Sequence, residues 1–101
     1  LWIGGHGDEA VRVAAEHDAG LFVWLPRSPT DLDGYRRKLR ARSATSQLGA
    51  SLPLARVEGR WLEASRDLRD AGADLLVVLR RYDEGAIADL ERYASEVASR
   101  L

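Results

Sequence analysis

The chain has 101 residues, of which 46% are hydrophobic and 31% charged, the balance of one globular domain and not of a disordered or fibrous segment. With 15 basic and 16 acidic residues, its formal net charge of -1 provides no overall positive field for nucleic acid or an anionic membrane. The absence of cysteine excludes disulfides and thiolate chemistry, and no apolar run approaches the ~18 residues of a membrane span. We therefore expect no nucleic-acid partner and no membrane partner.

The first quarter of the sequence predicts a strand, a tight loop, a helix and a second strand. The apolar run of residues 1–3 stops at a glycine-rich loop, and apolar residues then recur at helical spacing over residues 10–15. Gly20 stands where a helix C-cap glycine is expected, and residues 21–25 form an apolar run typical of a parallel strand covered on both faces. The chain contains no methionine and no charged leader before this first strand, so we expect it to be a segment of a longer polypeptide.

The middle of the sequence predicts a second helix and then a stretch that is difficult to interpret. Thr30 and Asp33 have the spacing of a capping box, and the helix is expected to end near Arg42. Residues 43–51 are small and polar, which indicates a loop, and residues 53–57 are a weak strand candidate. One helical stripe of this second helix carries Leu32, Tyr35 and Leu39.

The last part of the sequence predicts a third helix, a strand and a fourth helix. The third helix runs through residues 61–68 and is stopped by Gly72, and residues 75–79 are the most apolar run, which we expect to be a buried central strand. Asp83 can cap the final helix. The apolar stripe expected to face the core from that helix consists of Ile87, Leu90, Ala94, Val97 and Leu101.

Four strand candidates, each followed by a helix, predict an α/β fold with right-handed crossovers and a parallel sheet. A closed eight-unit barrel takes ~250 residues, so four units amount to half a barrel, although a small open sheet has the same periodicity. Half a barrel would leave the strands at residues 1–3 and 75–79 unpaired, with an open inner face carrying Ile3, Val23 and Val77. That interpretation predicts a homo-oligomer or pairing with a complementary barrel half.

The segment Gly4-Gly5-His6-Gly7 is the clearest candidate for a binding site. It follows a strand and opens a helix, so its backbone N–H groups can converge on an anion at the positive end of the helix dipole. A dinucleotide fold also needs an acidic residue ~20 positions later, where this chain has Trp24-Leu25-Pro26. The alternative is that the glycines only permit a tight turn, and Asp8 and Glu9 beside them would repel an anion.

Four segments of the chain carry the pattern of a known family, and they are residues 2–7, 17–24, 68–77 and 90–97. In this order they resemble the C-terminal part of the luciferase-like flavin monooxygenases and their deazaflavin-dependent relatives. The resemblance implies half of a TIM-like (β/α)8 barrel from a cytoplasmic oxidoreductase that acts on a small organic substrate with flavin mononucleotide (FMN) or the deazaflavin coenzyme F-420. By matching position, it implies that the cofactor phosphate binds at Gly4, Gly5, His6 and Gly7.

Three further residues are candidates for substrate binding because they end predicted strands, the edge where sites of α/β proteins collect. They are Trp24 and Arg27 after the second strand and Arg80 after the last, although Trp24 is equally compatible with core packing. His17 has no partner residue spaced as a metal ligand, and the basic run of residues 36–42 is typical of a solvated helix face. No catalytic residue can be assigned, and a non-catalytic α/β fragment or interaction module is the alternative function.

Overall fold

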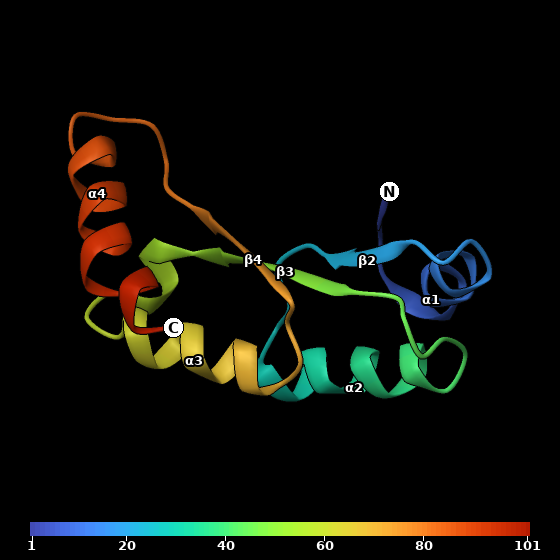
Figure 1. Cartoon of the computed structure of the whole chain (residues 1–101). Helices are drawn as coiled ribbons and strands as arrows, with labels where there is room; N and C mark the ends of the chain where they lie inside the picture. The colour runs from blue at the N-terminus through green and yellow to red at the C-terminus, as the bar shows by residue number, and fades with distance from the viewer.

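The computed structural model describes all 101 residues, in which four strands and four α-helices alternate (Figure 1). The strands are β1 (Trp2–Gly4), β2 (Gly20–Val23), β3 (Leu48–Pro53) and β4 (Leu75–Leu79). The α-helices are α1 (Gly7–Glu16), α2 (Pro29–Arg40), α3 (Trp61–Asp70) and α4 (Ala86–Glu96). Two short 3-10 helices, η1 (Leu54–Val57) and η2 (Ala98–Arg100), follow β3 and α4. The predicted α/β class is confirmed.

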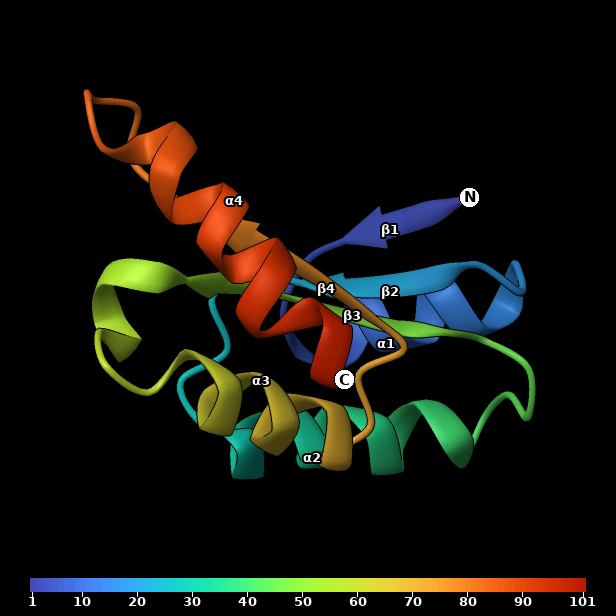
Figure 2. The ribbon, with the colours of Figure 1, turned by 60° about the vertical axis from the view of Figure 1, so that its left-hand side comes forward.

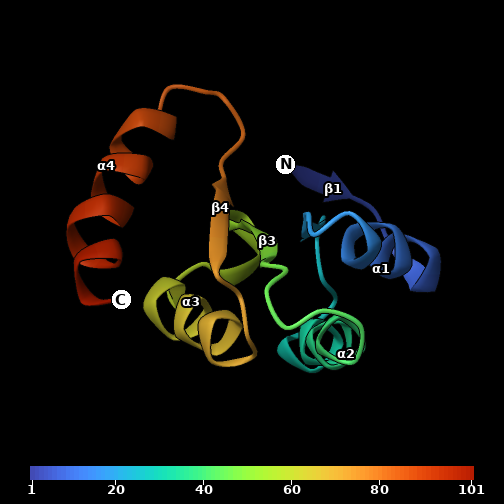
Figure 3. The same cartoon turned by 45° about the vertical axis from the view of Figure 1, so that its right-hand side comes forward.

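The strands lie side by side in the order β1-β2-β3-β4, and every neighbouring pair is parallel. When each right-handed crossover advances by one strand in the same direction, all helices come to lie on the same face of the sheet. Figure 3 shows the result: the four helices form an arc outside the strands, and no helix lies on the opposite side. The sheet is therefore singly wound, with a covered face toward the helices and an open face.

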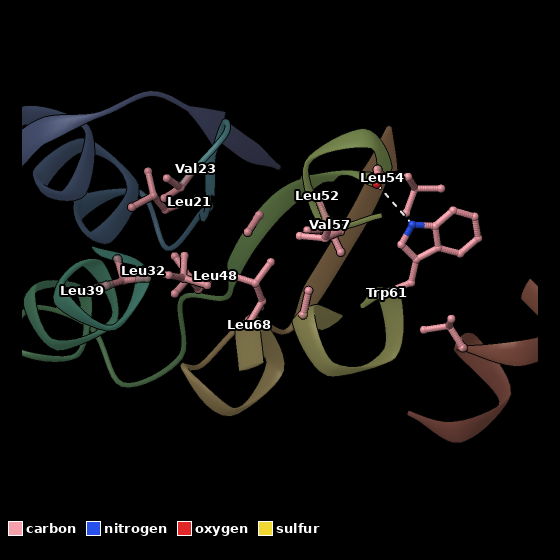
Figure 4. Close-up of a cluster of buried hydrophobic side chains, with 14 of the residues drawn as sticks. Leu21, Val23, Leu32, Leu39, Leu48, Leu52, Leu54, Val57, Trp61 and Leu68 are labelled. Carbon is pink, nitrogen blue, oxygen red and sulfur yellow. Dashed lines mark hydrogen bonds between the residues drawn. The ribbon is translucent and has the colours of Figure 1, made fainter. Parts of the chain in front are cut away.

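The hydrophobic core lies between the covered face and the helices (Figure 4). Trp61 Nε1 donates a hydrogen bond to Leu54 O at 3.2 Å, which ties η1 to α3 at one end of this core. We expected Ile3 and Val23 on the open face, but both pack on the covered side with the core. Side chains alternate along a strand, so the open face carries the neighbours of these residues instead. The strands contribute Leu21, Val23, Leu48, Ala50 and Leu52 to the core, and the helices contribute Val11, Leu32, Leu39 and Leu68.

The open face is apolar and partly exposed. The Trp2 side chain lies across it against two glycines, since a methyl group added at Gly20 would come 2.5 Å from Trp2 Cε3, and one at Gly49 would come 3.1 Å from Cζ3. Leu75 and Val77 on β4 are 39% and 37% exposed on the same face. Gly20 and Gly49 thus allow an indole to lie flat on the sheet.

The sequence prediction was wrong about the residues that form β3 and about the position of β4 in the sheet. The expected strand at residues 53–57 is wrong, because β3 occupies residues 48–53 and residues 54–57 form η1. The expected central strand at residues 75–79 is an edge strand, with an alternating pattern of exposure. The small residues of β3 carry little strand propensity, so its position inside the sheet depends on tertiary pairing with β2 and β4.

Two helix ends also differ from the sequence prediction. Gly20 begins β2 and is not the C-cap of α1, because the chain turns earlier, at Asp18, whose φ is 49°. The first turn of α2 is capped by Ser28, whose Oγ accepts a hydrogen bond from Asp31 N at 3.1 Å. Thr30, the expected capping residue, lies inside that first turn.

The last helix, α4, packs against α3 and crosses outside β4 (Figure 2). The hydroxyl groups of Tyr93 and Ser65 are hydrogen-bonded at 2.8 Å, and both side chains are buried. Of the stripe expected to face the core, Val97 alone is buried, while Ile87, Leu90 and the other two residues are exposed. The prediction failed because α4 docks through the side of the helix that carries Tyr93.

Candidate functional site

The residues expected to form a site all lie at one edge of the molecule. Gly4 ends β1, Trp24 and Arg27 follow β2, and Arg80 follows β4. Because the strands are parallel, their carboxyl ends share one edge of the sheet.

The glycine turn, residues 4–7, connects β1 to α1. A methyl group added at Gly4 or Gly7 would meet no atom within 4 Å, so both positions face open space. The same addition at Gly5 would come 3.0 Å from Ala10 Cβ, and Gly7 has a φ of 82°, a conformation that favours glycine. Packing and backbone geometry therefore require Gly5 and Gly7, whereas nothing in the fold itself requires Gly4.

Tyr35, on α2, reaches the glycine turn from the neighbouring unit. Its Oη accepts a hydrogen bond from Gly7 N at 2.9 Å, and its ring meets the His6 ring edge-on with centroids 6.4 Å apart. The phenolic proton is left for an acceptor placed at the start of α1, where first-turn N–H groups have no partner within the helix. The sequence marked Tyr35 only as part of an apolar stripe.

The two carboxylates at the start of α1 are paired with cations. Asp8 Oδ1 lies 2.7 Å from Lys38 Nζ, and Glu9 pairs with Arg12 one turn along the helix. The hydrogen bond from Lys38, together with its charge, lowers the pKa of the Asp8 carboxyl, and Arg12 lowers the pKa of Glu9 in the same way. The charge of Arg42 acts on both carboxylates in the same direction. From the sequence, Asp8 and Glu9 were expected to repel an anion at the glycine turn. The positive charges of these cations offset that repulsion.

Trp24 lies just beyond β2 and is 49% exposed. Its ring lies beside that of Phe22, with centroids 6.2 Å apart and the planes inclined at 49°. The core alternative for Trp24 does not apply, because about half of this residue is exposed. Trp24 instead extends an aromatic surface from the strand toward the carboxyl edge.

Arg27 lines a cavity of about 360 Å³ at the carboxyl end of β3. The loop before α2, η1 and α3 form its walls, and none of residues 4–7 lines it. Two further arginines, Arg56 and Arg60, line this cavity, and Asp67 is the one carboxylate among the lining residues. We call this space the arginine cavity. The sequence did not single out Arg56 or Arg60, because two arginines in this short stretch form no motif and Arg27 lies far from them in the chain.

Arg80 connects the end of β4 to the start of α4. Its Nε donates to Asp89 Oδ2 at 2.7 Å and its Nη1 donates to Asp83 Oδ2 at 3.1 Å. Asp83 Oδ1 also accepts from Gly85 N at 2.9 Å, and Gly85, not Asp83 as expected, is the N-cap of α4. Two carboxylates thus neutralise the guanidinium, an arrangement that favours a structural role, while substrate binding by Arg80 stays a prediction.

No family model matches this chain, and comparison with curated proteins and with solved structures finds no match either. None of its helices combines the length and the apolar composition required to cross a membrane. No group of three or more histidine and carboxylate side chains is arranged to hold a metal ion. Function therefore has to be inferred from the glycine turn, the arginine cavity and the open face.

Proposed function

We propose that this chain is the C-terminal half of a TIM-like barrel from a luciferase-like flavin- or deazaflavin-dependent oxidoreductase. In this proposal the chain supplies the turn that holds the cofactor phosphate and one wall of a pocket for a small organic substrate. The observation that carries it is a glycine turn, open to solvent, at the carboxyl edge of a singly wound parallel sheet. The active sites of TIM barrels lie at that edge.

The winding of the sheet supports half a barrel over a small open domain. An open parallel sheet normally has helices on both faces, because its strand order reverses at a switch point. Here the order does not reverse, and the open face exposes Trp2, Trp24, Leu75 and Val77. Further strands joined to β1 and β4 would cover this face and pair both edges, and a complementary half or a second copy of the chain can provide them.

Residues around the glycine turn fit an anionic phosphate group. Gly4 faces free space, the Tyr35 hydroxyl has a proton to donate, and Lys38 and Arg42 supply positive charge beside the start of α1. A bound flavin or deazaflavin supplies the redox chemistry. The residues of this chain would hold its phosphate and, through Trp24, contribute an aromatic wall to the substrate pocket.

A pair of glycine variants tests the phosphate site in the complete protein. Gly4→Ala should weaken binding of FMN or F-420 at least about tenfold, measured by quenching of cofactor fluorescence, because the added methyl group occupies the space of the phosphate. Gly34→Ala is the matched control, since a methyl group at Gly34 on α2 also meets no atom within 4 Å. Equal affinity of the two variants would remove the glycine turn as the site.

Self-association tests the half-barrel interpretation separately. We expect light scattering during size-exclusion chromatography to show dimers or larger species of the 11.2 kDa chain, because the exposed apolar open face and both free edges favour pairing. A soluble, cooperatively folded monomer at high concentration would contradict half a barrel.

The open face also favours the alternative function, a non-catalytic interaction module that retains only the scaffold. Its exposed tryptophans and β4 side chains would then bind a protein partner and no cofactor. Visible flavin absorbance in the purified protein distinguishes the two functions, because the module predicts none.

A further inference from the structure

We propose that the arginine cavity binds a phosphate dianion, either free phosphate or the phosphate group of a small organic ester. This site is separate from the glycine turn and does not depend on the chain binding a flavin. It lies where the loop before α2, η1 and α3 meet at the carboxyl end of β3. Its volume of about 360 Å³ is that of a small-ligand pocket, for which ~300–1,000 Å³ is typical.

The cavity gathers guanidinium groups that the fold does not use elsewhere. The side chains of Arg27 and Arg56 form no ion pair with a carboxylate. Arg60 Nη1 lies 3.8 Å from Glu63 Oε1, which is too long for a hydrogen bond. A guanidinium presents paired N–H donors that match two phosphate oxygens, so these side chains carry the donors that phosphate recognition needs.

The charge balance of the lining favours a dianion. Three guanidinium groups and the Asp67 carboxylate line the cavity, which leaves an excess of two positive charges. Two carboxylates outside the lining lie near these arginines: Glu63 Oε1 is 3.8 Å from Arg60 Nη1, and Asp31 Oδ2 accepts a hydrogen bond from Arg27 N at 3.0 Å. Asp31 is thus engaged with backbone at the first turn of α2 and leaves the Arg27 side chain free.

The loop that carries Arg27 is fixed in an unusual conformation. Leu25 has a φ of 52°, a left-handed conformation that a leucine rarely adopts, and its N–H donates to Ser51 Oγ at 2.7 Å. Ser51 is buried, and β3 borders the cavity at this residue. The strained turn therefore places Arg27 at the wall of the cavity opposite η1 and α3.

Calorimetric titration of the chain with inorganic phosphate and with glycerol phosphate, at constant ionic strength in chloride, tests this site. Arg56→Gln should weaken phosphate binding about tenfold or more, because it removes a charge-assisted hydrogen bond. Asp67→Asn should tighten binding, because it removes the opposing charge. Arg81→Gln is the charge-matched control, since Arg81 is exposed in the segment after β4 and does not line the cavity.

Tighter binding of glycerol phosphate than of inorganic phosphate would identify the ligand as an organic ester, and tighter binding of inorganic phosphate would identify it as free phosphate. Circular dichroism checks that each variant is folded, as expected for substitutions at exposed side chains. The proposal fails if Arg56→Gln and Arg81→Gln bind phosphate equally, or if Asp67→Asn binds no tighter than the unmodified chain. Arg56→Gln should leave binding of FMN or F-420 by the complete protein unchanged, because Arg56 does not belong to the glycine turn, so failure at one site is distinguishable from failure at the other.

Discussion

Leu48→Ala should destabilise the chain several times more than Leu75→Ala, although both leucines lie in parallel strands. Leu48 in β3 is fully buried, and Leu75 in β4 is 39% exposed on the open face. A leucine-to-alanine change in a core costs about 2–5 kcal/mol, since a cavity adds to the lost transfer free energy. At Leu75 about three-fifths of the residue is removed from water and no closed cavity forms, which lowers the cost to about 1 kcal/mol.

Urea unfolding followed by circular dichroism measures both values, with unchanged slopes showing that the unfolded states are comparable. A domain of this size has a stability of about 5–15 kcal/mol, so loss at Leu48 removes a large part of it. Low protein concentration keeps any pairing of the open faces out of the measurement, and at high concentration the cost at Leu75 should rise. An equal or larger cost for Leu75→Ala at low concentration would refute a sheet with β3 inside and β4 at the edge.

Three further outcomes follow from burial and contacts. Val77→Asp should leave a folded chain, because this residue is 37% exposed, whereas Val23→Asp should prevent folding by burying an unpaired carboxylate. Thermal unfolding measures the stability of both variants, and an equal loss of stability would contradict the open face. Ser65→Ala should cost about 1–2 kcal/mol in chemical unfolding, because it leaves the hydroxyl partner on α4 without its hydrogen bond, and a neutral effect would contradict that contact. The hydrogen bond from Arg80 lowers the pKa of Asp83 below its ordinary 3.8, so the stabilising pair is intact above that pH and is lost as pH falls through the lower folded-state pKa. A carboxyl-carbon NMR titration with a midpoint at or above 3.8 would contradict the pairing.

The sequence predicted those elements whose signal is local. The apolar run of β4 and the helical spacing that ends before Gly72 are both found where expected, and Gly72 has a φ of 116° that suits glycine at a helix end. By contrast, β3 was missed, because Gly49, Ala50 and Ser51 have no strand signal of their own. They form a strand because Leu48 and Leu52 on either side pack into the core and both neighbouring strands supply hydrogen-bonding partners.

The candidate sites divide in the same way. The glycine turn was located from contiguous residues, since a strand, glycines and a helix start are visible in the order of the chain. Tyr35 and Lys38 were missed as partners of that turn, because 28 and 30 residues separate them from Gly7 and Asp8. The arginine cavity was missed for the same reason, as its residues come from the loop before α2, from β3, from η1 and from α3.

By itself, the sequence determined the class of the protein: alternating strands and helices, hence a parallel α/β sheet, with a glycine turn after the first strand. Its hydrophobic periodicity specifies which residues leave water, and this depends on neighbours within a few positions. Tertiary structure alone decided that β4 is an edge strand, that one face of the sheet stays open and that three arginines meet around one cavity. Those features depend on strand order and on contacts between distant units, and no local pattern of residues encodes either of them.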